Sequence, residues 1–241
     1  MKLLRLATTL NPTSAPYNQF SLGLKKAVDQ TYCSLLKNDI PIEDSIVGFH
    51  GDGSIFKMIK VVRNLIKQHN FDVVHIHSGV TGIILLIAAF PFKISIFKKT
   101  VFTLHNSWNV IKFRNQILNF IVMLVARTIC TCGQSSRESI PKVINFFIAK
   151  KTIAIVNGFD NERIDKIKNS KDAMKHFSDS SLVKILCVGA LNNTKNQISL
   201  LKALKEITVD CELVFLGDGA NKEALTKFSQ QLNSNLDIRF K

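Results

Sequence analysis

Short apolar segments alternate with longer amphipathic segments along the whole chain of 241 residues. Apolar runs of about four to eight residues predict buried strands, and an apolar period of about 3.6 predicts helices packed on a sheet. Such alternation is typical of βαβ units with a parallel sheet. Strands are expected at 3–8, 42–49, 73–77, 100–104, 128–132 and 152–156. Helices are expected at 20–36, 54–69, 81–90, 113–126 and 135–145.

A polar, turn-rich stretch interrupts this pattern from Asn157-Gly158 onward and is typical of an interdomain connection. The alternation then restarts, with strands expected at 182–188, 211–216 and 236–240 and helices at 196–207 and 222–232. We therefore expect an α/β protein. A complete N-terminal Rossmann-like domain spans 1–160, and the first half of a second Rossmann-like domain spans 161–241.

The charge of the chain is strongly positive and unevenly placed. There are 32 Lys and Arg against 18 Asp and Glu, a net charge of +14, and residues 1–160 carry +11 of it. Four basic residues share one side of the helix expected at 54–69: Lys57, Lys60, Arg63 and Lys67. A basic amphipathic helix of this kind indicates contact with an anionic membrane surface, although a solvated helix face is the alternative.

A nucleic-acid-binding protein is a rival class, because clustered lysines are also its electrostatic footprint. The chain has no helix-turn-helix or zinc-finger spacing and no RNA-recognition motif, and it offers only one Trp and two Tyr for base stacking. We therefore expect no nucleic-acid partner.

The cysteines and the apolar runs indicate in which cellular compartment the protein is found. Five cysteines with no CxxC pair argue against a disulfide framework and fit a reducing cytosol. The N-terminus lacks the apolar core of a signal peptide, and the longest apolar runs, 83–92 and 117–126, are too short for a bilayer, which needs ~20 residues. We expect a cytoplasmic protein that lies peripherally at the inner face of the cytoplasmic membrane.

Polar side chains with possible chemistry end two of the expected strands. His75 and His77 alternate on one face of strand 73–77, near the carboxyl end where open α/β sheets bind ligands. They are either a metal pair or, as we favour, one packed imidazole and one, His77, that reaches the ligand crevice; we expect no metal. His105 follows strand 100–104, where a histidine can donate to a substrate hydroxyl. Cys130 and Cys132 also share a face, typical of small buried residues.

The second half of the chain contains a candidate anion site. Strand 182–188 is followed by Gly189 and then by Lys195 at the opening of a helix. Backbone N–H groups at a helix N-terminus together with an ammonium group suit a phosphate, although an ordinary solvated lysine is the alternative. Gly217 and Gly219 form a second tight turn after strand 211–216, which would equally serve as a plain connection.

Five segments in order and spacing resemble the family-4 glycosyltransferases of the GT-B fold: FDVVHIHSG, TVFTLHN, IAIVNGFD, ILCVGALNNTKNQISLLKAL and ELVFLGDG. The resemblance implies two Rossmann-like domains facing across a cleft. The first would hold a glycan or lipid-linked acceptor and the second a nucleotide-sugar donor. It also implies retaining, metal-independent sugar transfer in cell-surface polysaccharide synthesis, with the donor as substrate and no cofactor.

The resemblance also assigns residues. His105 matches the histidine that faces the donor sugar, and Lys195 matches the lysine that contacts the donor diphosphate. The remaining matches lie near the substrates: Gly189, Gly217 and Gly219, and also Ser14 and Ala15 at the place of the family's glycine pair after the first strand.

Three departures from the family pattern leave an alternative open. The family's glycine pair after the first strand is replaced by TSAP at residues 13–16, which hinders close approach of the backbone to a phosphate. Ala190 replaces the arginine that usually follows Gly189, which removes one of two cations from the leaving group. The acidic E-x7-E segment that holds the ribose and the donor sugar would lie beyond Lys241. A catalytically incompetent fragment, or a subunit that depends on a partner, is therefore the alternative to an active transferase.

Overall fold

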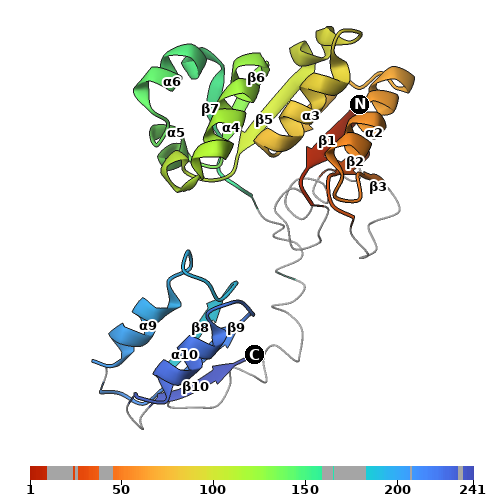
Figure 1. The fold of residues 1–241 in the computed structure, drawn as a ribbon. Coiled ribbons are helices and arrows are strands. Elements are labelled where there is room, and N and C mark those ends of the chain that lie inside the picture. Colours follow the sequence, from red (N-terminus) through yellow and green to blue (C-terminus); the bar gives the residue numbers. More distant parts are fainter. Residues whose placement is uncertain are drawn as a thin grey trace. The chain divides into compact units, whose positions relative to one another are not determined.

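The computed structural model describes residues 1–9, 24, 27–37, 46–158, 165, 183–206, 208–232 and 236–241. The chain divides into two compact units, Met1–Asn161 and Glu162–Lys241 (Figure 1). The sequence pattern placed the boundary at residue 160. The roles expected for the two domains, acceptor side and donor side, stay predictions.

The first unit contains a seven-stranded parallel sheet in the order β3-β2-β1-β4-β5-β6-β7. This is the doubly wound strand order, in which the carboxyl ends of β1 and β4 lie next to each other at the reversal of the chain order. The strands are β1 (Lys2–Ala7), β2 (Asp29–Ser34), β3 (Ile46–His50), β4 (Val73–Ile76), β5 (Thr100–Leu104), β6 (Thr128–Thr131) and β7 (Thr152–Ala154).

Helices α2 (Ile55–Gln68), α3 (Gly79–Ala89) and α4 (Phe113–Val125) pack side by side over one face of this sheet (Figure 1). They bury every second residue of the central strands, such as Leu4 and Leu6, in the main hydrophobic core. The shorter helices are α5 (Gln134–Glu138), α6 (Lys142–Ile148), η2 (Ile94–Lys99), η3 (Trp108–Val110) and η4 (Ala149–Lys151).

Two of the expected helices were wrong. The helix expected at 20–36 contains β2, a parallel strand between β1 and β3. Its sequence, DQTYCS, is polar because Gln30 is buried against Arg5 of β1 and not against an apolar layer. The helix expected at 135–145 is divided into α5 and α6 at Pro141, whose ring disfavours a helical conformation for the residue before it. The strand expected at 42–49 lies partly outside the described residues and is seen as β3.

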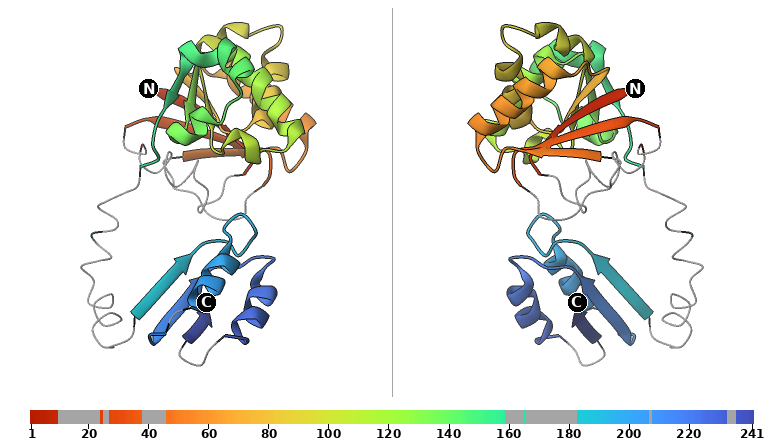
Figure 2. Two further views of the ribbon diagram at one scale, coloured as in Figure 1. Left: turned by 90° about the vertical axis from the view of Figure 1, so that its left-hand side faces the viewer. Right: turned by 90° about the vertical axis from the view of Figure 1, so that its right-hand side faces the viewer.

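The second unit contains a three-stranded parallel sheet in the order β10-β9-β8. Its strands are β8 (Val183–Val188), β9 (Cys211–Leu216) and β10 (Leu236–Phe240), and its helices are α9 (Gln197–Leu204) and α10 (Lys222–Ser229). Leu201 of α9 and Leu225 of α10 pack with Leu213 and Phe215 of β9, so both helices cover one face (Figure 2). As expected for the first half of a Rossmann-like sheet, the first strand, β8, lies at the edge.

Candidate active site

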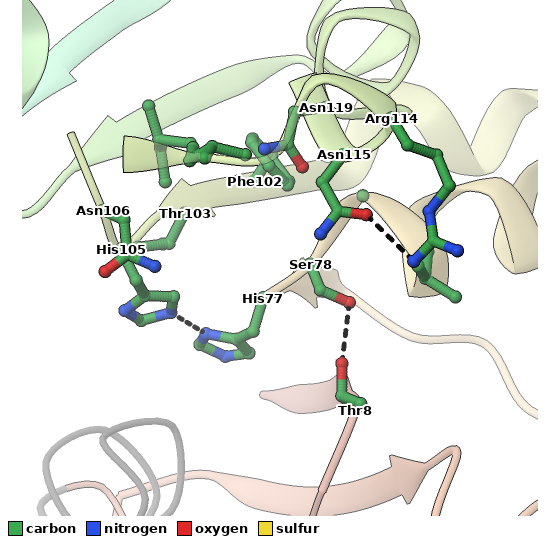
Figure 3. Close-up of a pocket in the computed structure, with 14 residues that line it drawn as sticks. Thr8, His77, Ser78, Phe102, Thr103, His105, Asn106, Arg114, Asn115 and Asn119 are labelled. Carbon is green, nitrogen blue, oxygen red and sulfur yellow. Dashed lines mark hydrogen bonds between the residues drawn. The ribbon is translucent and has the colours of Figure 1, made fainter. Parts of the chain in front are cut away.

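The candidate site of the first unit lies at the carboxyl ends of β4 and β5. A pocket of about 310 Å³ opens there between the ends of these strands, the first turn of α3 and one side of α4. Its polar lining includes Thr8, Ser78, His105, Asn106, Arg114 and Asn119 (Figure 3). Ser78 is the N-cap of α3 and also accepts a hydrogen bond from Thr8. This is the place where the topology of an open α/β sheet puts a ligand.

His77 and His105, which the sequence singled out separately, lie together at this pocket. The Nδ1 atom of His77 is 3.0 Å from Nε2 of His105, and the two rings stack with centroids 5.2 Å apart (Figure 3). His77 is only 8% exposed, whereas His105 is partly exposed. His77 lines the pocket and also contacts His105, and its role in substrate binding stays a prediction.

Arg5 lies behind the histidines on the same face of the sheet and was not predicted as part of the site. Because Leu4 and Leu6 point into the core under the helices, Arg5 between them points to the opposite face, where it is 1% exposed. One of its terminal nitrogens, Nη1, is 2.9 Å from Nδ1 of His75 and 3.3 Å from Nε2 of His77. Its Nε donates to Oε1 of Gln30 over 3.1 Å.

The surroundings keep the three imidazoles neutral. Burial, together with the charge of Arg5 and the neighbouring His105, lowers the pKa of His75 to about 3. Burial also lowers the pKa of His77 well below its usual value, and Arg5 acts in the same direction. Burial alone lowers the pKa of His105. The pKa of Arg5 itself falls to about 10 through burial, so its guanidinium remains charged at neutral pH.

The metal-pair interpretation of His75 and His77 does not fit these contacts. The pair faces the positive charge of Arg5, and Nε2 of His75 is 2.7 Å from the hydroxyl of Thr103. Among the described residues no three side chains of the metal-ligating types gather in one place. The two imidazoles act as hydrogen-bonding groups here.

Cys132 joins the site from the end of the next strand. Its Sγ is 3.6 Å from Nδ1 of His105, and it also hydrogen-bonds with the side chain of Asn157. Burial raises the pKa of the Cys132 thiol, which keeps it protonated. The expectation that Cys130 and Cys132 are small buried residues was wrong, because both are half-buried and Cys132 contacts the partly exposed His105.

The second unit brings Gly189, Lys195, Gly217 and Gly219 into two adjoining loops. The N–H of Gly189 donates to Leu216 O over 3.0 Å, and the N–H of Leu191 donates to Asp218 O over 2.9 Å. Lys195 is exposed and lies over Gly189, where its Cε would be 3.8 Å from a Cβ placed on that glycine. Its backbone N–H is already bonded to the side chain of Asn192, so only the ammonium group offers itself to an anion.

The remaining predicted site residues are placed as follows. Ser14 and Ala15 lie outside the described residues. His77 and His105 are brought together in the first unit, and Gly189, Lys195, Gly217 and Gly219 are brought together in the second. Arg5 and Cys132 were missed as site residues, although a charge inside the apolar run of β1 is itself a signal of a buried polar cluster.

The basic side chains of α2 make more contacts within the protein than the sequence indicated. Lys57 pairs with Asp52, and the Lys67 ammonium lies 4.9 Å from the centroid of the Phe92 ring. Arg63 is half-buried and donates to Ile87 O and Ala88 O, over 2.9 and 3.2 Å, at the end of α3. Arg63 therefore caps a neighbouring helix. In the described part of the chain, no helix has the length and apolar character needed to span a bilayer.

Comparison with solved structures shows the fold. The HepE protein of Anabaena, in complex with UDP-glucose, is 15% identical with a TM-score of 0.68, and the match covers 100% of this chain and 69% of HepE. The lipopolysaccharide outer core galactosyltransferase WaaB is 14% identical with a TM-score of 0.64, covering 100% of this chain and 68% of WaaB. The UDP-N-acetylglucosamine 2-epimerase of Rickettsia bellii is 15% identical with a TM-score of 0.58, and the match covers 100% of this chain and 68% of the epimerase chain.

The presence of an epimerase among these structures means that the fold alone does not select the reaction. No curated protein matches the sequence. The model of Glycosyltransferase Family 4, however, matches residues 34–163, a range that includes His75, His77, His105 and Asn157. The expected fold class, an α/β chain of the GT-B type with a second Rossmann-like unit, is confirmed, and the chain belongs to glycosyltransferase family 4.

Proposed function

We propose that this protein moves a sugar from a nucleotide-sugar donor to a glycan or lipid-linked acceptor, with retention of configuration, in the synthesis of cell-surface polysaccharide. The match of family 4 over the polar pocket of the first unit carries the proposal. The likeness in fold to a protein solved with UDP-glucose supports the donor class. The likeness to a lipopolysaccharide galactosyltransferase supports the acceptor class.

The two units divide the work in this proposal. The pocket of the first unit presents hydroxyl, amide and guanidinium groups from Ser78, Asn119 and Arg114, a combination suited to a hydroxyl-rich acceptor. His105, neutral and held by His77, stands at its rim as the group that contacts the reacting sugar. The second unit binds the donor through the turns at Gly189 and Gly217.

Lys195 has the chemical task of balancing the leaving group. When the glycosidic bond of the donor breaks, negative charge develops on the departing diphosphate, and a fixed ammonium group stabilises it more in the transition state than in the ground state. Because Ala190 provides no second cation, removal of the Lys195 ammonium group should lower the rate of transfer strongly. We propose that this transfer needs no added metal ion.

We further propose a peripheral location at the inner face of the cytoplasmic membrane, with the basic side of α2 toward anionic lipid. The exposed Lys60 and Lys67 are the residues best placed for this contact, since Arg63 is occupied by the end of α3.

The test is a transfer assay on the full chain with membrane lipid extract and labelled UDP-, ADP- and GDP-hexoses, with and without EDTA. We expect a labelled lipid or glycan product of retained anomeric configuration in both conditions. Lys195→Met should reduce kcat strongly, whereas Lys205→Met, an exposed lysine beyond α9, should not. Absence of label from all donors would count against the proposal, and loss of product in EDTA would remove its metal-independent part.

A partner-dependent subunit is the second candidate, and one observation favours it. Strand β8, the first strand of the donor unit, is paired on one side only in the described sheet. If the chain alone gives no product and addition of a cell extract restores transfer, with the chain present in the active complex, this candidate replaces the first.

A further inference from the structure

The buried guanidinium group of Arg5 and the histidines around it form one connected hydrogen-bond network. This network runs along one face of the sheet from β1 through β4 and β5 to the end of β6. Arg5 and His75 are direct register partners in the paired strands β1 and β4. Backbone pairing of β1 with β4 therefore places Arg5 beside His75, and the other contacts follow from the ends of the neighbouring strands.

We propose that Arg5 is a positioning residue that fixes the proton of His105 on Nδ1, through His77. The reasoning starts from the guanidinium group, which has only donors and no acceptor. Each ring nitrogen that Arg5 contacts must therefore present its lone pair. These nitrogens are Nδ1 of His75, at 2.9 Å, and Nε2 of His77, at 3.3 Å.

The remaining protons follow in order, because a neutral imidazole has one donor nitrogen and one acceptor nitrogen. His77 accepts at Nε2, so it carries its proton on Nδ1 and donates it to Nε2 of His105 over 3.0 Å. His105 then accepts at Nε2 and carries its own proton on Nδ1, which faces the sulfur of Cys132 at 3.6 Å. His75 accepts at Nδ1 and donates from Nε2 to the Thr103 hydroxyl over 2.7 Å.

This assignment limits what His105 does in the proposed reaction. A second proton on Nε2 of His105 would face the N–H of His77, and His77 is held in that tautomer by Arg5. His105 is thus kept neutral and orientated, and Nε2 is not available to take a proton from an acceptor hydroxyl. The tautomer assignment stands on the contacts alone, whereas its use in sugar transfer rests on the proposed function.

The experiment is long-range ¹H–¹⁵N correlation NMR on the full chain with ¹⁵N-labelled histidine rings, which separates the two neutral tautomers. We expect the proton on Nδ1 in His77 and His105 and on Nε2 in His75, with the exposed His69 as an internal reference. A proton on Nε2 of His105 in the unmodified chain would overturn the proposal, whether or not any variant folds.

Substitutions then test the direction of the effect. Arg5→Met should release the tautomers of His77 and His105, and Arg5→Lys, which keeps a charged donor, should restore them. The matched control is Thr103→Val, which removes the partner of His75 and should change the His75 signals while those of His105 keep the Nδ1 tautomer. If Arg5→Met leaves the tautomers of His77 and His105 unchanged, Arg5 does not determine where their protons lie. Because the readout is spectroscopic, a failed transfer assay would leave this result intact.

Discussion

A side chain on Gly217 would collide with the backbone of Gly189. A Cβ built on Gly217 would lie 2.3 Å from the carbonyl oxygen of Gly189, and Gly217 has a φ of +147°. Gly219 stands in the same relation to Leu191, whose carbonyl oxygen would be 2.4 Å from its Cβ. The two glycines that the resemblance assigns to the nucleotide are therefore also required for the contact between two loops of the second unit.

We predict that Gly217→Ala destabilises the second unit even without nucleotide. Gly189→Ala is the matched control, because Gly189 also has a positive φ, +145°, while its Cβ would meet only the Lys195 side chain at 3.8 Å. The extra cost of the Gly217 variant should be ~1–3 kcal/mol, the usual cost of overpacking. Hydrogen exchange of residues 183–241 measures it, and fluorescence of the single Trp, in the first unit, should stay unchanged. Equal costs for the two variants would contradict the collision.

The buried histidines make the first unit sensitive to acid. His75 has a folded-state pKa of about 3 against 6.5 for the unfolded chain, and it faces Arg5, His77 and Thr103. Between these pH values the unfolded state binds a proton that the folded state does not, so stability falls as the pH is lowered from 6.5 toward 3. Each such histidine contributes at most about 1.4 kcal/mol per pH unit.

We therefore predict that urea unfolding of the first unit, followed by the fluorescence of Trp108, shows a steep loss of stability between pH 6.5 and 5. His75→Gln, whose amide can accept from Arg5 and donate to Thr103 without titrating, should reduce the slope. A slope that is the same in the unmodified protein and in His75→Gln would mean that other groups govern the acid response.

The sheet and helix order of both units could be predicted largely from the hydrophobic pattern, because most strands are short apolar runs, although β1 and β4 are interrupted by Arg5 and His75, and because the helices between them are longer. The bounds of β9 and β10 agree with the expected ones. The failure at β2 has a clear cause. Gln30 and Ser34 are buried polar residues, Gln30 bonded to Arg5 and Ser34 to the backbone of Leu36, so β2 lacks the continuous apolar run that predicts a buried strand.

The candidate site was predictable only in part, because the sequence reveals its residues one by one and not the contacts between them. His77 and His105 stand at strand ends, where the sequence reveals them. Their contact with each other depends on β4 and β5 being neighbours, which the strand order supplies. Arg5 could be found only by asking where a charge in the middle of an apolar strand obtains its partners.

We predict that the chain binds anionic vesicles through α2. Lys60→Glu with Lys67→Glu, which leaves Arg63 on the end of α3, should weaken binding by about 2 kcal/mol, roughly 30-fold, at ~1 kcal/mol per basic residue. Lys202→Glu with Lys205→Glu, at exposed positions on and beside α9, changes the net charge equally and is the matched control. Vesicle sedimentation compares them, and equal release by both pairs would show attraction by net charge without a binding face.

The edge of the second sheet leads to the last prediction, which concerns self-association. β8 pairs with β9 on one side only, and it lies at the end of the described strand order. Its Leu186 and Val188 are 60% and 65% exposed on the face that α9 and α10 do not cover. An apolar strand at the edge of a sheet is a template for pairing with another chain.

We therefore expect the isolated 241-residue chain to associate in a concentration-dependent manner, and we expect Leu186→Lys with Val188→Lys to shift it toward the monomer. Lysines on an edge strand oppose pairing because two copies would bring their charges together. The matched control is Val143→Lys with Phe146→Lys on α6, where the side chains are 75% and 83% exposed but no strand edge is present. Sedimentation velocity at several concentrations decides between the two pairs. If the α6 pair restores the monomer as well as the β8 pair does, exposed apolar area drives association; if the unmodified chain is a monomer throughout, the β8 edge does not act as a template.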